Sequence, residues 1–160
     1  MTAVSAQVAR WLTALLLACW SPPVTGPIVE PFRAPVCEYC AGHRGIEFAA
    51  TPGSFVRAVA AGRVTFSGRV AGVTYVVIEH ADGLRATYGM VAVALVQQGT
   101  NAQAGSAVAV AGPRLFFGLR RGARYLDPGP WFGEERTRPR LVPLGGRNRR
   151  PGRVVRVCGS

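Results

Sequence analysis

A histidine and a glutamate stand four residues apart in the segment GHRGIE, where Gly45 separates His43 from Glu47. In an extended strand, residues at even separation point to the same face, so these two side chains can meet. An imidazole and a carboxylate suit a zinc ion, but a hydrolytic zinc site needs three protein ligands and an open fourth position. The spacing therefore predicts the first half of a metal site or, as the alternative, a hydrogen-bonded pair at the start of a strand.

Two cysteines precede this histidine and produce a C-x-x-C-x-x-H spacing with Cys37, Cys40 and His43. These residue types can hold zinc at compact spacing, but a closed site of thiolates and imidazole would be structural and not hydrolytic. In an exported chain a disulfide is the favoured alternative. Cys158 could then tie the tail to the start of the domain through Cys37 or Cys40, with one thiol left over, and the connectivity stays open.

The elements that would position these side chains are predicted to be strands. Hydrophobic residues make up 49% of the 160 residues, and 20 Gly and 12 Pro favour short strands and turns over long helices. The segments TYVVIEH and LRATYGM, joined by ADG, predict a hairpin. No amphipathic helix of useful length is predicted after residue 26. We therefore predict an all-β antiparallel core; its other strands are expected in residues 54–70, interrupted at Gly62 and Gly68, around Gly99 and Gly105, and in a last hairpin that turns at Gly122.

The N-terminal segment, residues 1–26, has the pattern of a signal peptide. One arginine precedes the apolar run WLTALLLACW, whose ten residues are about half of the ~20 that span a bilayer. An uncleaved anchor helix or a short buried helix are alternatives, and LLAC is a weak match to a lipidation signal at Cys19. The domain is expected outside the cytoplasm, secreted or in the cell envelope, with membrane contact only through this segment.

The remaining chain divides into a Pro-rich lead-in at 27–41, a core domain at 42–132 and an Arg-rich tail at 133–160. All 19 basic residues are arginine, and the formal net charge is +11. Such a chain attracts polyanions. No aromatic-basic nucleic-acid motif stands out, so anionic wall polymers or a membrane surface are favoured over nucleic acid. The tail is either solvated or adheres to an anionic envelope, and its RVVRVC segment could add an edge strand.

Four segments occur in an order and spacing that resemble a known family: GHRGIEFAATPGSFVRAVAAGRVTFSGRVAG, YVVIEHADGLRATYGMV, VQQGTNAQAGSAVAVAG and GPRLFFGLRRGARYLDP. Over about residues 27–128 the chain resembles the lysostaphin/LytM-type zinc metallopeptidases, and its GLRRG…YLDP segment resembles the actinobacterial branch. The resemblance implies a compact antiparallel β-sheet sandwich of the duplicated-hybrid-motif type. It also implies murein hydrolysis by a zinc ion.

The family positions that bind zinc and transfer protons are mostly changed in this chain. The resemblance assigns zinc ligands to His43 and to Glu47, which replaces an aspartate. It assigns the third ligand to the position of Phe116, and the two further histidines to the positions of Arg114 and Met90. Phenylalanine offers no lone pair, arginine stays protonated and methionine transfers no proton. His43 and Glu47 are therefore interpreted as vestigial zinc ligands, and His80, before the hairpin turn, as structural.

The sequence favours an exported, catalytically inactive domain that binds peptidoglycan or regulates a wall hydrolase. Its expected partners are peptidoglycan or anionic wall polymers and a wall hydrolase, and its expected binding residues are Tyr88, Arg114 and Phe116. No cofactor is expected in that case. The alternative is an active zinc endopeptidase with an altered ligand set, in which zinc would be bound; a decaying paralogue without a role is a third possibility.

Overall fold

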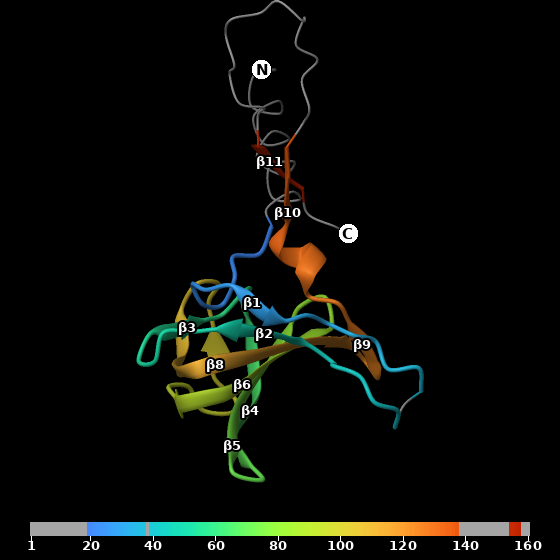
Figure 1. Ribbon diagram of the computed structural model, residues 1–160. Coiled ribbons are helices and arrows are strands. Elements are labelled where there is room, and N and C mark those ends of the chain that lie inside the picture. Colours follow the sequence, from blue (N-terminus) through green and yellow to red (C-terminus); the bar gives the residue numbers. More distant parts are fainter. Residues whose placement is uncertain (1–18, 38, 138–153, 158–160) are drawn as a thin grey trace, which may run out of the picture. The chain divides into compact units, whose positions relative to one another are not determined.

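The computed structural model describes residues 19–37, 39–137 and 154–157, and its strands between Ile28 and Leu126 form one antiparallel sheet (Figure 1). The strands are β1 Ile28–Glu30, β2 Ile46–Ala49, β3 Phe55–Arg57, β4 Gly62–Val70, β5 Val73–His80, β6 Leu84–Ala94, β7 Asn101–Ala102, β8 Ala107–Arg121 and β9 Arg124–Leu126. Their order is β1-β2-β8-β6-β5-β4-β7, with β3 and β9 also paired to β8. The predicted all-β antiparallel fold is confirmed.

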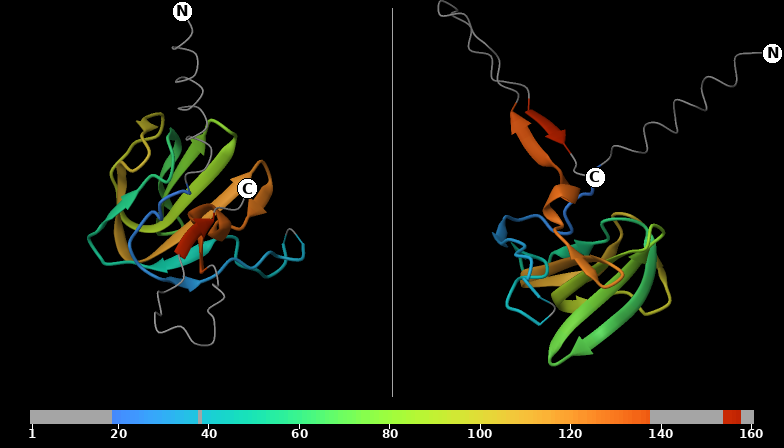
Figure 2. Two further views of the ribbon diagram at one scale, coloured as in Figure 1. Left: turned by 90° about the horizontal axis from the view of Figure 1, so that it is seen from above. Right: turned by 90° about the vertical axis from the view of Figure 1, so that its right-hand side faces the viewer.

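The longest strand, β8, runs through the middle of the sheet and pairs with β2, β3, β6 and β9. Sequence reasoning divided this stretch into separate short strands, but the structure continues it from Ala107 to Arg121. The predicted hairpin of β5 and β6 and the last turn at Gly122 are both present. Figure 2 shows the strong curvature of the sheet and its projecting green hairpin of β4 and β5.

Alternation along β8 separates a core face from an outer face. Leu115, Phe117 and Leu119 are at most 1% exposed, and they belong to the apolar core. The residues between them point to the other face, because successive side chains alternate across a strand. Arg114 and Phe116 therefore share the outer face of the sheet with their cross-strand neighbours, and this face contains the candidate site.

The prediction that Tyr88 contacts a ligand is wrong, because the side chain lies in the core. Tyr88 is 0% exposed and packs edge-to-face against Phe117, with 5.3 Å between the ring centroids. Its hydroxyl accepts a hydrogen bond of 3.0 Å from the Val59 backbone N–H. Burial raises the pKa of Tyr88 far above its usual value, since a buried phenolate would lose its hydration.

We expect the buried Tyr88 to make the fold sensitive to alkali. Above about pH 10 the unfolded chain releases this proton while the folded chain retains it, so the free energy of unfolding should fall by about 1.4 kcal/mol per pH unit. Urea unfolding of the wild type and of Tyr88→Phe, measured from neutral to alkaline pH, tests this. An equally steep decline in the phenylalanine variant would contradict the assignment.

The chain divides into two compact units, residues 20–129 and a second unit made of residues 1–19 and 130–160. The Pro-rich lead-in contributes β1 to the first unit. In the second unit, β10 Glu134–Thr137 pairs with β11 Val154–Val157 in a separate two-stranded sheet, so RVVRVC does not extend the main sheet. A short 3-10 helix, Gly129–Phe132, begins at the boundary. Of residues 1–26, where a signal or anchor helix is predicted, residues 1–18 lie outside the described residues and residues 19–26 form no helix.

The cysteines pair differently from the predicted connection between the tail and the domain. Cys37 and Cys40 are bonded to each other, because three residues of separation bring their Cα atoms within 4.9 Å in a turn. Neither can therefore bond Cys158, which lies outside the described residues. Cys19 is also disulfide-bonded. A sulfur atom in a disulfide cannot also carry a lipid through a thioether bond. Among residues 19–37, 39–137 and 154–157, no helix is long and apolar enough to cross a bilayer.

Candidate functional site

His43 and Glu47 meet on the outer face of the sheet, as their spacing predicts. The Nε2 atom of His43 lies 3.5 Å from Oε1 of Glu47, and both side chains are 14% exposed. At this distance the contact is too long for a hydrogen bond. It is close to the separation of about 3.4 Å between two ligands that bind one tetrahedral zinc at 2.0–2.2 Å. The longer side chain of Glu47 therefore does not separate the carboxylate from the histidine.

The lead-in segment fixes the orientation of His43. His43 and Arg33 exchange two backbone hydrogen bonds, of 3.0 and 2.9 Å, and Nδ1 of the ring lies 3.0 Å from the carbonyl oxygen of Pro31. A carbonyl only accepts, so Nδ1 carries a proton, and the neutral form of the ring with this proton presents a lone pair at Nε2. No hydrogen-bond partner reaches this buried nitrogen. Zinc-binding histidines show the same arrangement.

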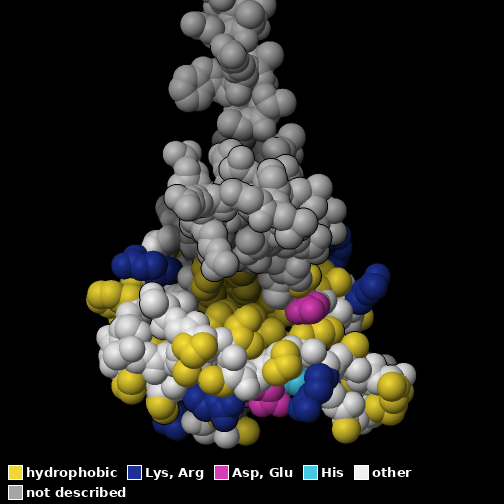
Figure 3. Space-filling model, turned by 45° about the horizontal axis from the view of Figure 1, so that its top comes forward, with side chains coloured by type: hydrophobic (Ala, Val, Ile, Leu, Met, Phe, Trp, Pro, Cys, Tyr) yellow, Lys and Arg dark blue, Asp and Glu magenta, His cyan; other side chains and the backbone are white. Residues whose placement is uncertain are grey.

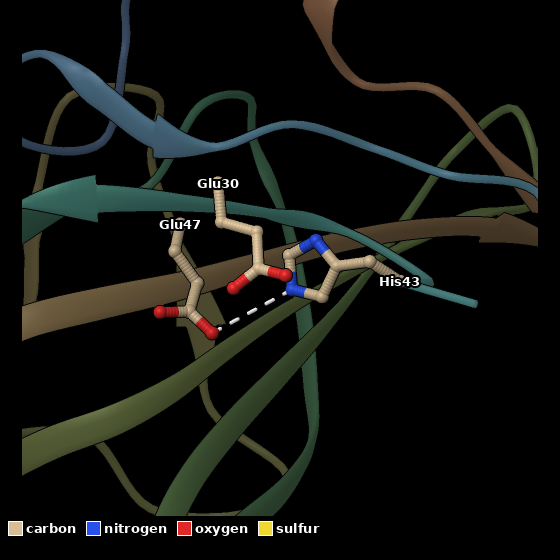
Figure 4. Close-up of side chains that lie close together, drawn as sticks. All are labelled: Glu30, His43 and Glu47. Carbon is tan, nitrogen blue, oxygen red and sulfur yellow. Dashed lines mark ion pairs between the residues drawn. The ribbon is translucent and has the colours of Figure 1, made fainter. Parts of the chain in front are cut away.

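A third possible ligand, Glu30, comes from β1 and was missed by sequence reasoning. Glu30 lies directly across from Glu47 in the antiparallel pairing of β1 and β2. Its carboxylate converges with His43 and Glu47, and one ligand atom from each residue lies within 4.8 Å of the others (Figure 4). Figure 3 shows acidic, basic and histidine side chains side by side near the lower edge of the molecule. The cluster has the residue types of a zinc site, and its three residues would be the ligands.

Two arginines flank the carboxylates. Arg33 donates a 2.7 Å hydrogen bond to Glu30, and Nε of Arg114 lies 2.9 Å from Oε2 of Glu47. The second contact is an ion pair by distance alone, because Oε2 has no hydrogen bond. The side chains of Arg33 and Arg114 are 66% and 47% exposed, so solvent screens both pairs.

Phe116 sits at the position that the family resemblance assigns to the third ligand. Its ring meets His43 edge-on, with 5.7 Å between the centroids. A Cβ atom built at Gly45, Gly89 or Gly118 would come within 2.6 to 3.2 Å of this ring. The ring therefore lies over three glycines, which come from the segment before β2, from β6 and from β8 itself. The ring of Phe116 therefore packs closely against the backbone on the outer face, and it offers no lone pair to a metal ion.

Met90 and Arg114, at the two positions assigned to further histidines, lie where the pairing of β6 and β8 is interrupted. Register shifts flank Val91, and Met90 has a positive φ of 60°. Bulges of this kind commonly aim side chains at functional sites. Here the bulges present the thioether of Met90, a residue that is 37% exposed, and the guanidinium of Arg114. Neither group can exchange a proton with a substrate at neutral pH.

A groove beside Phe116 is the second feature that sequence reasoning missed. It encloses about 230 Å³, and we name it the Arg120 groove after the basic residue on its wall; it is lined by Arg44, Thr87, Phe116, Gly118, Leu119, Arg120 and Tyr125. The guanidinium of Arg44 lies over the Tyr125 ring at 5.6 Å. A wider hollow of about 950 Å³ shares Arg44, Arg120 and Tyr125 and also includes Arg124. An extended chain with negative groups fits this combination of arginine and aromatic side chains.

Arg120 has an unfavourable neighbour within the sheet. It lies directly across from Arg85 in the pairing of β6 and β8, and like charges in this position are destabilising. Arg85 forms an ion pair with Glu79. The arginine repeat in GLRRG was the available signal for this groove, but only the β8–β9 hairpin shows which of its arginines faces Tyr125.

The other residues that the sequence analysis considered, His80, Cys37 and Cys40, have structural roles. His80 is 6% exposed, and its Nδ1 lies 2.9 Å from the Ala61 carbonyl. Its ring packs against Trp20 at 5.6 Å, in agreement with the structural role predicted for it. Cys37 and Cys40 form a disulfide and are not zinc ligands.

Comparison with known proteins agrees with the fold. Residues 41–128 match the family model "Peptidase family M23". The murein hydrolase activator EnvC of Escherichia coli is 33% identical over 122 residues, which cover 69% of this chain and 28% of EnvC. Helicobacter pylori Csd3 superposes with a TM-score of 0.63 at 27% identity, over 80% of this chain and 37% of Csd3.

A zinc-containing peptidase from Vibrio cholerae is also similar in structure, with a TM-score of 0.59, 27% identity, and coverage of 71% of this chain and 40% of the peptidase. The chain thus spans well under half the length of each of these three relatives. The family model, however, covers more than half of the chain and includes β2, β8 and the residues between them. The chain belongs to peptidase family M23.

Proposed function

We propose that this chain is a non-hydrolytic M23 domain of the cell envelope that binds peptidoglycan on the outer face of its sheet. The observation that carries the proposal is the ion pair of 2.9 Å between Arg114 and Glu47, because the family resemblance assigns a histidine to the position of Arg114. The two positions that should transfer protons hold Arg114 and Met90. A zinc ion in such a site would polarise a carbonyl oxygen as a Lewis acid. Arg114 and Met90 cannot transfer the protons that hydrolysis needs.

Binding without hydrolysis needs a surface, and the Arg120 groove supplies one. Stem peptides of peptidoglycan present carboxylates, which pair with guanidinium groups through charge-assisted hydrogen bonds. Arg120 lines the groove, while Phe116 and Tyr125 offer apolar contact. Arg114, 47% exposed at the side chain, lies on the same face. These features support Arg114, Phe116 and Arg120 as binding residues.

Location in the envelope is part of the proposal. The Cys37–Cys40 disulfide supports it, because disulfides persist in oxidising compartments outside the cytoplasm. The apolar run of residues 11–20 and the similarity to a murein hydrolase activator support it as well. We propose that the mature domain is secreted or held at the cell surface.

Replacing Arg120 by alanine should weaken binding to purified peptidoglycan by about tenfold or more, because a hydrogen bond to a charged group contributes about 1.5–3 kcal/mol. Arg121→Ala is the matched control, since it removes the same charge from the next residue of β8, which does not line the groove. Cosedimentation at several salt concentrations measures both. Equal losses in the two variants would show that only net charge matters, and no binding by the wild type would refute the proposal.

A second candidate function is regulation of a wall hydrolase, and the similarity to EnvC favours it. In that case the outer face would bind a protein instead of the wall. The same preparations added to a purified wall amidase distinguish the two candidates. Faster release of wall fragments, without binding of the chain to peptidoglycan alone, would favour regulation.

A further inference from the structure

Two carboxylates face each other across neighbouring strands at the edge of the sheet. Glu30 and Glu47 are directly opposed in the β1–β2 pairing, and like charges in this position repel. Glu47 is only 14% exposed and Glu30 33%, so water screens the repulsion incompletely. A cation between them would remove this cost. The flanking arginines neutralise the carboxylates in part, but from exposed positions.

The histidine next to these carboxylates points to the kind of cation. The Nδ1 proton of His43 is directed to the Pro31 carbonyl, which leaves the lone pair of the buried Nε2 facing Glu47 without a hydrogen-bond partner. A protonated histidine would neutralise Glu47 only by giving Nε2 a proton. A bound metal ion would use the lone pair as it is. Imidazole selects zinc and similar transition metals over Mg²⁺ and Ca²⁺, which prefer oxygen ligands.

We propose that Glu30, His43 and Glu47 form a zinc site in which Glu30 is the third protein ligand. In this site the carboxylate of Glu30, in β1, replaces the ligand that the family resemblance expects at position 116. Phe116 has no lone pair to bind a metal ion. The backbone already holds all three residues in place, since Glu30 belongs to β1 and pairs with β2. Glu47 belongs to β2, and the bridge to Arg33 anchors His43. Glu30 is the most exposed of the three, so its side chain has room to close the distance of up to 4.8 Å.

Arg33 and Arg114 should then oppose metal binding. Each contacts one ligand carboxylate, at 2.7 and 2.9 Å. A cation beside a dication lowers the affinity of the site. The effect of removing these arginines distinguishes a zinc site from an ion pair that only stabilises the fold. If the Glu30–Arg33 pair only stabilises the fold, removing either partner has the same consequence. If Glu30 binds zinc, the two removals have opposite consequences.

The test is zinc binding by the full chain, stripped of metal and alkylated to block any free thiol. Affinity is measured by competition with a chromophoric chelator, and metal content by mass spectrometry. Glu30→Gln should weaken zinc binding by about 100-fold or more, since loss of an outer-shell partner alone costs 10–100-fold. Arg33→Gln and Arg114→Gln should tighten it. Glu79→Gln removes a carboxylate that is paired with Arg85 outside the cluster, and it should change nothing.

Thermal unfolding provides a second readout. Zinc in about 100-fold excess over its dissociation constant should raise the melting temperature of the wild type by on the order of 10 °C, and that of Glu30→Gln much less. Mg²⁺ and Ca²⁺ should produce no shift. Circular dichroism of each variant shows whether it is folded.

Absence of saturable zinc binding by the wild type would overturn the inference. A change in the same direction for Glu30→Gln and Arg33→Gln would overturn it as well. The inference is independent of the proposed function, because zinc can bind here without hydrolysis. Failure to bind zinc would leave a non-hydrolytic domain intact, whereas peptidoglycan cleavage would refute the proposed function and leave the metal site standing.

Discussion

Replacement of Phe117 by alanine should cost about 3–5 kcal/mol of unfolding free energy, whereas the same replacement at the preceding residue should cost about 1 kcal/mol. Phe117 is 0% exposed, and its ring packs against Tyr88 in the core. Phe116 lies on the outer face over three glycines and is only partly buried, so water can enter the space that its ring leaves. Since a domain of this size is stable by about 5–15 kcal/mol, Phe117→Ala should approach loss of the fold.

The two variants form a matched pair, because they remove the same side chain from adjacent residues of one strand. Urea unfolding with the disulfides intact measures both free energies. A similar loss in the two variants would mean that Phe116 is a core residue and that the outer face is not available to a ligand. A small loss in Phe117→Ala would contradict the assignment of the two faces of β8.

The second large effect concerns catalysis. Even when saturated with zinc, the chain should cleave peptidoglycan more slowly than an active zinc peptidase by a factor of at least about 10⁴. General acid-base catalysis by a single group contributes about 10²–10⁴, and the two positions that the family resemblance assigns to such groups are occupied by Arg114 and Met90. Arg114 keeps its proton, and it is engaged by Glu47 at 2.9 Å. Met90 has no proton to transfer.

Much of the fold could be predicted from local patterns. Alternating β-branched and aromatic residues around the ADG turn predict the hairpin of β5 and β6, which the structure confirms. The same parity argument placed His43 and Glu47 together, and they lie 3.5 Å apart. The hairpin prediction succeeds because the period of two is a property of the strand itself. His43, in contrast, lies before β2 and is separated from it by a bend at residues 44–45, so its contact with Glu47 does not follow from strand alternation.

The face of the sheet on which a side chain lies depends on the pairing of distant strands, and it could not be predicted from the sequence. Tyr88 was expected to be a binding residue, but it pairs with Phe117 on the core side, while its neighbour Gly89 pairs with Phe116. A shift of one residue in register reverses the face of every side chain, and the sequence of β6 alone does not determine it.

Glu30 was missed for a related reason. It lies in a Pro-rich segment that suggests a linker, and only the pairing of β1 with β2 brings it opposite Glu47. The Arg120 groove likewise needs Arg44, before β2, to meet Tyr125 in β9. Glu30 and Glu47 are 17 positions apart, and Arg44 and Tyr125 are 81 positions apart, so no periodic pattern in the sequence links either pair.

The central claim is that the chain lacks hydrolytic activity, and the most direct test compares two proteins on one substrate. Purified peptidoglycan is incubated with the zinc-supplemented wild type and with His43→Ala, and newly formed amino groups in the soluble fraction are measured. The account predicts the same background release from both. Release by the wild type that disappears in His43→Ala and on addition of a chelator would contradict it.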